Sequence, residues 1–127
     1  MLKVKIGIKS EEINNTNTVI ASLLTIEVLF GEENRRRITF DSRKNQIIRI
    51  GRIKNKETDF AFEDGDVSRK QCMIIFEDNN WYIIDGNGEN PSSNGTWFYP
   101  EKFFNISDGL IVRMGTTLFE CKYIQDH

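Results

Sequence analysis

Three short polar groups stand where apolar runs meet turns, and their side chains could bind an anion. They are Ile50-Gly51-Arg52, Val67-Ser68-Arg69-Lys70-Gln71-Cys72 and Ser92-Ser93-Asn94-Gly95-Thr96. Together they offer a guanidinium fork, hydroxyls and an amide, all of which can donate hydrogen bonds to an oxyanion. None of them pairs a nucleophile with a base, so the expected chemistry is binding of an oxyanion rather than its transformation.

The residues that catalysis and metal binding need are scarce. The only histidine is His127, so a Ser–His–Asp or Cys–His arrangement lacks its base and a multi-histidine metal site is excluded. The glycine-rich segment from Asp85 to Glu89 lacks the central glycine and the closing glutamate of a calcium loop. We therefore expect no catalytic residue, no metal ion and no cofactor.

Composition excludes several classes of partner. The chain has 127 residues, of which 17 are basic and 19 acidic, and a net charge of −2 disfavours a broad nucleic-acid surface. The basic triplet from Arg35 to Arg37 stands beside Glu32 and Glu33, which predicts a solvated strand edge. No run of 18 apolar residues occurs, so no membrane span is expected. Two cysteines without a disulfide pattern favour a nuclear or cytoplasmic protein.

Strand signals dominate the chain, and they predict an all-β fold. Apolar residues alternate with lysines and glycine near the N-terminus, and turn-forming residues recur at the spacing typical of an antiparallel sandwich or barrel. No segment shows a sustained helical period. The expected strands cover residues 2–9, 21–30, 37–40, 46–50, 60–62, 71–76, 81–84, 96–99, 110–114 and 117–123.

In order and type, the polar groups resemble the motifs of the forkhead-associated (FHA) domain family. The family pattern is Gly-Arg, then Ser-x-x-His, then Ser-x-Asn-Gly-Thr. This chain has Gly51-Arg52, then Ser68 to Gln71, then Ser92 to Thr96. The resemblance runs from about Ala21 to Tyr123 and implies an antiparallel FHA/SMAD-like β-sandwich of about eleven strands with binding loops at one end. Residues 1–18 would be a strand and a polar loop appended to a domain over residues 19–127.

The resemblance also implies a site for phosphothreonine. Arg52 would pair with the phosphate, Ser68 would donate its hydroxyl to a phosphate oxygen, and Arg69 would add a second cation. Ser93 holds a position at which the family contacts the phosphothreonine. Asn94 would hold the backbone of the peptide beside it.

Four further residues would support the loops, and one of them departs from the family pattern. Gly51, Gly95 and Thr96 match the pattern, with Gly95 permitting a tight turn. Gln71 stands where the family usually has histidine, and its amide offers a donor and an acceptor at similar reach. This exchange would make the site insensitive to titration near pH 6.5.

Two features bear on which peptide fits. In the family, the residue two before the motif serine can contact the side chain three positions after the phosphothreonine, and this residue is Asp66. Charge complementarity then predicts aversion to acidic residues at that position and a preference for Lys or Arg. The segment from Gly86 to Pro91 is longer than the family pattern and could alter which peptides fit.

Structural alternatives stand beside these roles. Arg52 could pair with a surface carboxylate, Ser68 could end a turn, and Asn94-Gly95 could serve only as a hairpin turn. Our prediction is a monomeric module, not an enzyme, that binds threonine-phosphorylated partner proteins and neither nucleic acid nor membrane. The alternative is a docking subunit with the same fold that binds a larger complex without phosphate; an enzyme is a distant third possibility.

Overall fold

The described part of the protein is all-β. The computed structural model describes residues 3–12, 19–30, 36–52, 56–98, 100 and 102–124. This part of the chain contains nine strands and no helix, and therefore no helix that could cross a membrane. The strands are β1 (Lys3–Glu12), β2 (Val19–Phe30), β3 (Arg37–Asp41), β4 (Ile47–Arg52), β5 (Phe60–Phe62), β6 (Cys72–Glu77), β7 (Asn80–Asp85), β8 (Ile111–Met114) and β9 (Thr117–Glu120).

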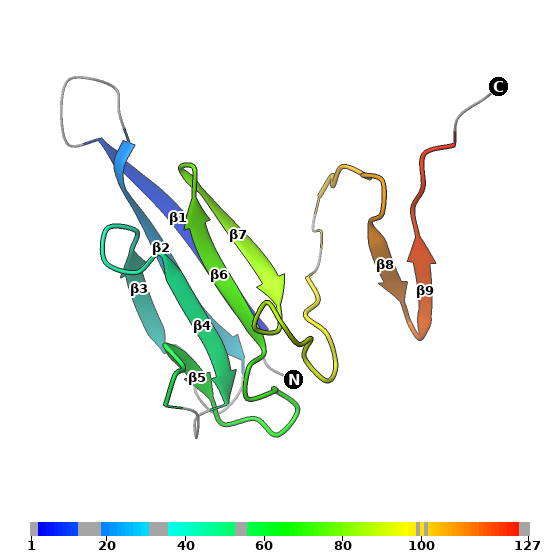
Figure 1. Ribbon diagram of the computed structural model, residues 1–127, viewed down its shortest axis with the longest axis horizontal. Helices are drawn as coiled ribbons and strands as arrows, with labels where there is room; N and C mark the ends of the chain where they lie inside the picture. Colours follow the sequence, from blue (N-terminus) through cyan, green and yellow to red (C-terminus); the bar gives the residue numbers. More distant parts are fainter. Residues whose placement is uncertain are drawn as a thin grey trace. The chain divides into compact units, whose positions relative to one another are not determined.

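The chain forms two compact units (Figure 1). Unit 1, Met1–Thr96, holds a three-stranded sheet in the order β1-β2-β3 and a four-stranded sheet in the order β5-β4-β6-β7. Unit 2, Trp97–His127, holds the hairpin of β8 and β9. All predicted site residues belong to unit 1.

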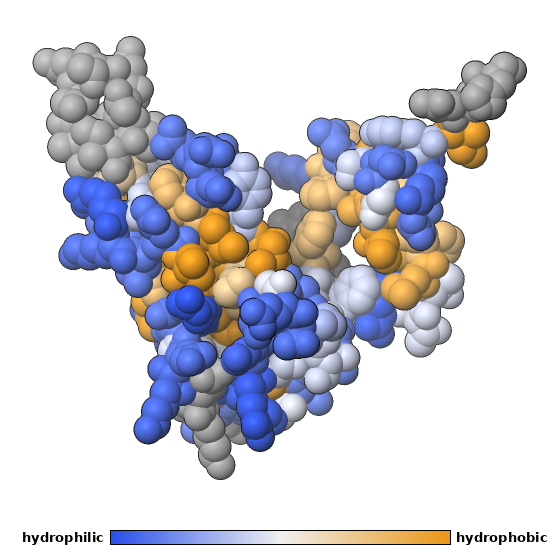
Figure 2. All heavy atoms as spheres, in the orientation of Figure 1, coloured by the Kyte–Doolittle hydropathy of each residue, from blue (hydrophilic) through white to orange (hydrophobic). Residues whose placement is uncertain are grey.

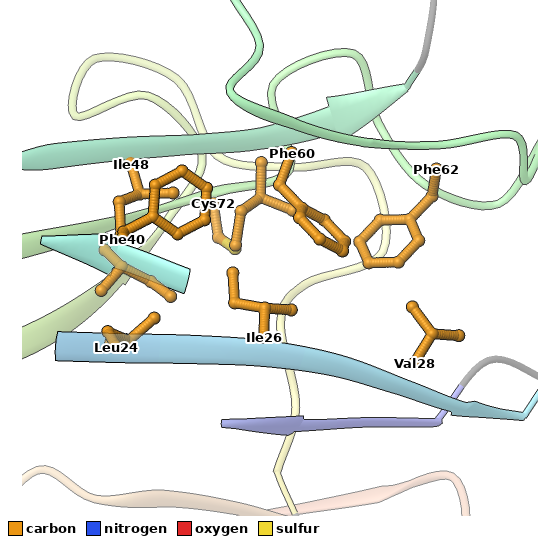
Figure 3. Close-up of a cluster of buried hydrophobic side chains, with 10 residues drawn as sticks. Leu24, Ile26, Val28, Phe40, Ile48, Phe60, Phe62 and Cys72 are labelled. Carbon is orange, nitrogen blue, oxygen red and sulfur yellow. The ribbon is translucent and has the colours of Figure 1, made fainter. Parts of the chain in front are cut away.

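The two sheets of unit 1 pack against each other across one hydrophobic core (Figure 3). Alternation along β2 turns Leu24, Ile26 and Val28 to one face, where each is almost fully buried. From the facing sheet, Ile48 and the aromatic ring of Phe60 complete the core with their neighbours. This core provides a rigid base for the loops that leave β4, β5 and β7.

The expectation of a purely antiparallel arrangement is wrong at one place, because β5 runs parallel to β4. Ile50 of β4 pairs with Phe60 of β5, and the two strands run in the same direction. Asp59 holds the start of β5 in this position: its backbone N–H donates to the Arg49 carbonyl (2.8 Å), and its carboxylate accepts the Arg49 N–H (2.8 Å). A strand of three residues carries no directional signal that sequence patterning could have detected.

The basic triplet is not simply a solvated edge, because Arg36 packs onto β5. Its guanidinium lies 4.2 Å from the centre of the Phe60 ring and donates a hydrogen bond to the Ala61 carbonyl. Arg37 is exposed, as expected, and Arg35 lies outside the described residues.

Turn chemistry sets most strand boundaries. Asp78 and Asn79 both have positive φ (51° and 64°), which gives the tight hairpin turn expected between β6 and β7. The strand expected at residues 96–99 is absent over 96–98, and Tyr99 lies outside the described residues. In its place the Thr96 hydroxyl donates to the Asp85 carboxylate, so this residue belongs to a loop. Residues 13–18 and 31–34, which stand between expected strands and whose polar residues predict a loop and a turn, also lie outside the described residues.

Candidate functional site

Strand pairing brings the three polar groups to one end of unit 1. Ile50 of β4 pairs with Cys72 of β6, and Cys72 pairs with Asp85 of β7. The end of β4, the start of β6 and the end of β7 therefore lie side by side. The segments 63–71 and 86–96 leave the sheet at this end (Figure 1), which Figure 2 shows to be largely hydrophilic.

These segments surround an open pocket of about 1190 Å³. Four of the five residues predicted to bind phosphate line it: Arg52, Ser68, Arg69 and Ser93. Lys56 and Lys70 add two cations that lie in the same pocket. Three carboxylates, from Glu57, Glu63 and Asp64, also line it, so the pocket carries both signs of charge.

Asn94 and Asp66, which were also predicted site residues, do not line the pocket. The side-chain amide of Asn94 donates to the backbone carbonyl of Asp66 (3.2 Å). This contact joins the segment before β6 to the segment after β7. The Asp66 side chain is exposed.

Arg52, a half-buried residue at the last position of β4, lines the pocket. Within the described part of the chain, no carboxylate forms an ion pair with it. The alternative role of Arg52 as the partner of a surface carboxylate therefore gains no support. A guanidinium in this setting has donors left for an external anion.

Ser68 and Ser93 meet directly at the pocket. The Ser93 N–H donates to the Ser68 hydroxyl oxygen (2.9 Å). A hydroxyl that accepts one hydrogen bond still has its own proton to donate. Ser68 can therefore join the two segments and donate to a ligand at the same time.

Gln71 uses both ends of its amide to tie the segments together. Its oxygen accepts the Ser68 N–H (2.9 Å), while its nitrogen donates to the Gly95 carbonyl (2.8 Å) and to the Thr96 hydroxyl (3.0 Å). The Gln71 N–H also donates to the Ile50 carbonyl (2.9 Å). None of these contacts depends on a group that titrates near neutral pH.

Two glycines allow the segments to approach the sheet and turn. A Cβ atom at Gly51 would lie 1.9 Å from the Arg69 carbonyl oxygen, so the loop before β6 rests directly on the backbone of β4. Gly95 has a φ of +79°, a conformation that L residues with a side chain rarely adopt.

Asp85 is a loop-supporting residue that the sequence did not single out. Its carboxylate accepts hydrogen bonds from the Ser92 N–H (3.0 Å), the Ser92 hydroxyl (2.6 Å) and the Thr96 hydroxyl (2.7 Å). Burial by itself would raise the pKa of Asp85, but the hydrogen bonds from Ser92 and Thr96 outweigh it and lower the pKa. An aspartate at a strand end is too common a pattern to have indicated this role.

We expect the contribution of Asp85 to the stability of the protein to depend on pH. Because its pKa is lower in the folded protein than in the unfolded chain, its contribution is complete above about pH 4 and falls as the pH drops through the folded value. Asp85→Asn should therefore destabilise the protein at pH 7 and have a smaller effect at pH 3. Urea unfolding at both pH values measures this, and an equal loss at both would contradict the role.

The Cys72 thiol, a possible nucleophile, lies in a setting that keeps it protonated. Cys72 is buried, and burial together with the nearby Asp85 carboxylate raises the pKa of its thiol to about 11. The thiol is therefore protonated near neutral pH and a poor nucleophile. No three His, Cys, Asp or Glu side chains among these residues are grouped as metal ligands.

Comparison with known families supports the same assignment as the geometry. The FHA domain family matches residues 48–115, just over half of the chain and every predicted site residue. The chain belongs to the FHA family. FHA domains generally mediate phosphopeptide-dependent protein interactions, and the family is one of interaction domains rather than of enzymes. Comparisons with curated proteins and with solved structures gave no match.

Proposed function

We propose that this FHA domain binds phosphothreonine in a partner protein. The observation that carries the proposal is the pocket lined by Arg52, Ser68, Arg69 and Ser93, in which the Arg52 guanidinium pairs with no described carboxylate. A phosphothreonine carries a charge of about −1.5 to −2 and three acceptor oxygens. Arg52 and Arg69 supply opposite charge, and Ser68 supplies a hydroxyl donor.

Asn94 has a second part in this proposal. Its amide nitrogen donates to the Asp66 carbonyl and so supports the loop beside the pocket, and the family resemblance assigns to this residue the contact with the backbone of the bound peptide. Two or three charge-assisted hydrogen bonds, each contributing about 1.5–3 kcal/mol, are compatible with micromolar affinity, about −8 kcal/mol. Hydrogen bonds within the loops keep the cost of ordering them low.

The proposal also covers the extent and setting of the domain. We propose that the domain spans residues 19–127 and folds as an FHA sandwich. In this proposal β1 lies before the domain and adds a third strand to the sheet of β2 and β3. It would act as a monomer on phosphorylated partners in the nucleus or cytoplasm, and it would contact neither nucleic acid nor membrane.

A peptide library tests this function. Three pools of degenerate peptides would carry phosphothreonine, phosphoserine or unmodified threonine at one fixed central position. The phosphothreonine pool should be retained and the threonine pool should not. Equal retention of the phosphothreonine and threonine pools would instead support a docking subunit that works without phosphate.

The same pocket predicts a charge preference in the flanking sequence. Glu63 and Asp64 line it, and Asp66 is exposed in the same segment. Among retained phosphothreonine peptides, Lys or Arg should be enriched at the third position after the phosphothreonine, with an advantage of up to about fivefold because exposed ion pairs contribute at most about 1 kcal/mol. Asp66→Ala should reduce this enrichment. Selection of aspartate at that position would contradict the prediction.

A further inference from the structure

The segment from Gly86 to Pro91 forms one wall of the pocket. None of the residues proposed to bind phosphate lies in this segment, so its part in binding is open. Three of its residues, Asn87, Asn90 and Pro91, line the pocket. They lie in the stretch between the end of β7 and the serines of the last polar group. Residues of this segment are therefore positioned to contact whatever the pocket binds.

The segment is closed by a compact turn around Asn87. The Asn87 side-chain oxygen accepts the N–H of Glu89 (3.0 Å) and the N–H of Asn90 (2.7 Å), and the Asn87 N–H donates to the Asn90 carbonyl (3.2 Å). Gly86 permits the closure: its φ is +71°, and a Cβ atom there would lie 1.9 Å from the Asn90 carbonyl oxygen.

These hydrogen bonds fix the orientation of the Asn87 amide. Both partners of the side chain are N–H donors, and only the oxygen of an amide can accept them. The Nδ2 group takes no part in the turn, and it donates to no residue in the described part of the chain. Asn87 is half-buried in the pocket wall, and its Nδ2 atom is not among the buried atoms, so this donor is open to a ligand in the pocket.

We propose that Asn87 is a further ligand-binding residue, whose Nδ2 group donates a hydrogen bond to an acceptor oxygen of the bound phosphopeptide. This inference rests on the proposed function and adds a contact outside the three polar groups. The acceptor is either a phosphate oxygen or a main-chain carbonyl oxygen of the peptide, which offer the donor the same chemistry. The turn holds the donor in place before the peptide arrives, so little ordering is needed on binding.

Asn87→Asp separates ligand binding from the turn. An aspartate keeps an oxygen that accepts the Glu89 and Asn90 N–H groups, but it has no Nδ2 donor and adds a negative charge. Asn90→Asp is the matched control, because it adds the same charge to the same pocket wall and leaves the Asn87 amide intact. The probe is the phosphothreonine peptide most enriched in the library selection.

We expect both variants to keep the melting temperature of the parent protein. We expect Asn87→Asp to weaken binding more than Asn90→Asp does: about three- to tenfold more if the acceptor is a carbonyl oxygen, and more than about tenfold if it is a charged phosphate oxygen. Equal weakening by the two variants would overturn the proposal, because charge alone would then account for the effect.

Nuclear magnetic resonance of the side-chain amides provides a readout that does not depend on affinity. The Asn87 Nδ2 signals should shift when the selected peptide binds. If phenyl phosphate alone also shifts them, the acceptor is a phosphate oxygen; if only the peptide does, the acceptor is a carbonyl oxygen. Unmoved Asn87 signals in a protein that binds the peptide would overturn this inference alone. Absence of any phosphopeptide binding would overturn the proposed function together with it.

Discussion

Arg52→Ala is expected to lower the affinity for a phosphothreonine peptide by about 10- to 150-fold, the equivalent of one charge-assisted hydrogen bond. The guanidinium stands at the end of β4 and lines the pocket without an ion-pair partner among the described residues. Removing it takes away the donor placed to pair with the phosphate. Isothermal titration calorimetry with the phosphorylated peptide measures the loss.

Arg49→Ala provides the matched control for Arg52. Arg49 lies three residues earlier on the same strand, is exposed, and does not line the pocket. The Arg49→Ala substitution removes one positive charge, as Arg52→Ala does, so a general electrostatic effect on binding would appear in both variants. The assignment of Arg52 requires that only its own variant loses phosphate-dependent affinity; similar losses in the two variants would count against it.

Gly51→Ala is expected to damage both the loop before β6 and the binding it supports. The new Cβ atom would lie 1.9 Å from the Arg69 carbonyl oxygen, whereas real Cβ contacts stay above 3.0 Å, so the backbone must move by about 1.1 Å. Overpacking of this kind costs about 1–3 kcal/mol of stability. Because Ser68 and Arg69 move with the loop, peptide affinity should fall by at least about tenfold. Urea unfolding and peptide titration measure the two effects.

Gly7→Ala tests whether the loss is specific to the position. Gly7 also lies within a strand, but a Cβ atom there would meet nothing within 4 Å. We expect its stability to change by no more than about 0.5 kcal/mol and its peptide affinity to stay the same. A Gly51→Ala protein as stable and as active as the Gly7→Ala protein would show that the loop does not need this close approach.

Much of the fold could be predicted because strand patterning in this chain is local. The apolar, β-branched run over residues 21–30 predicted a strand there, and the polar residues around Asp78 and Asn79 predicted a hairpin turn. The structure adds that Leu24, Ile26 and Val28 face the core and that the turn residues have positive φ. The parallel pairing of β5 could not be predicted, since it depends on Asp59 closing onto Arg49, ten residues earlier. The resemblance, not the pattern, suggested eleven strands, and that number remains a prediction.

The residues of the site also differ in whether the sequence could predict them. Motif residues such as Arg52 and Ser68 could be named because a short motif specifies their types and order. Asp85 and Asn87 could not, because their roles consist of hydrogen bonds to particular neighbours in a folded loop. Gln71 lies between these cases: its amide chemistry suggested that it could take the place of histidine, and the hydrogen bonds to Ser68 and Gly95 show how it joins the segments.

The most direct test of the central claim follows the Arg52 side chain itself during binding. The Nε–H signal of Arg52 would be recorded by nuclear magnetic resonance while one peptide is added in its threonine-phosphorylated and unmodified forms. We predict that the phosphorylated form shifts the Arg52 signal together with the backbone amides of Ser68 and Ser93, and that the unmodified form leaves all three unchanged. Binding of the phosphorylated peptide without a shift at Arg52, or equal shifts with both forms, would contradict phosphothreonine recognition at this site.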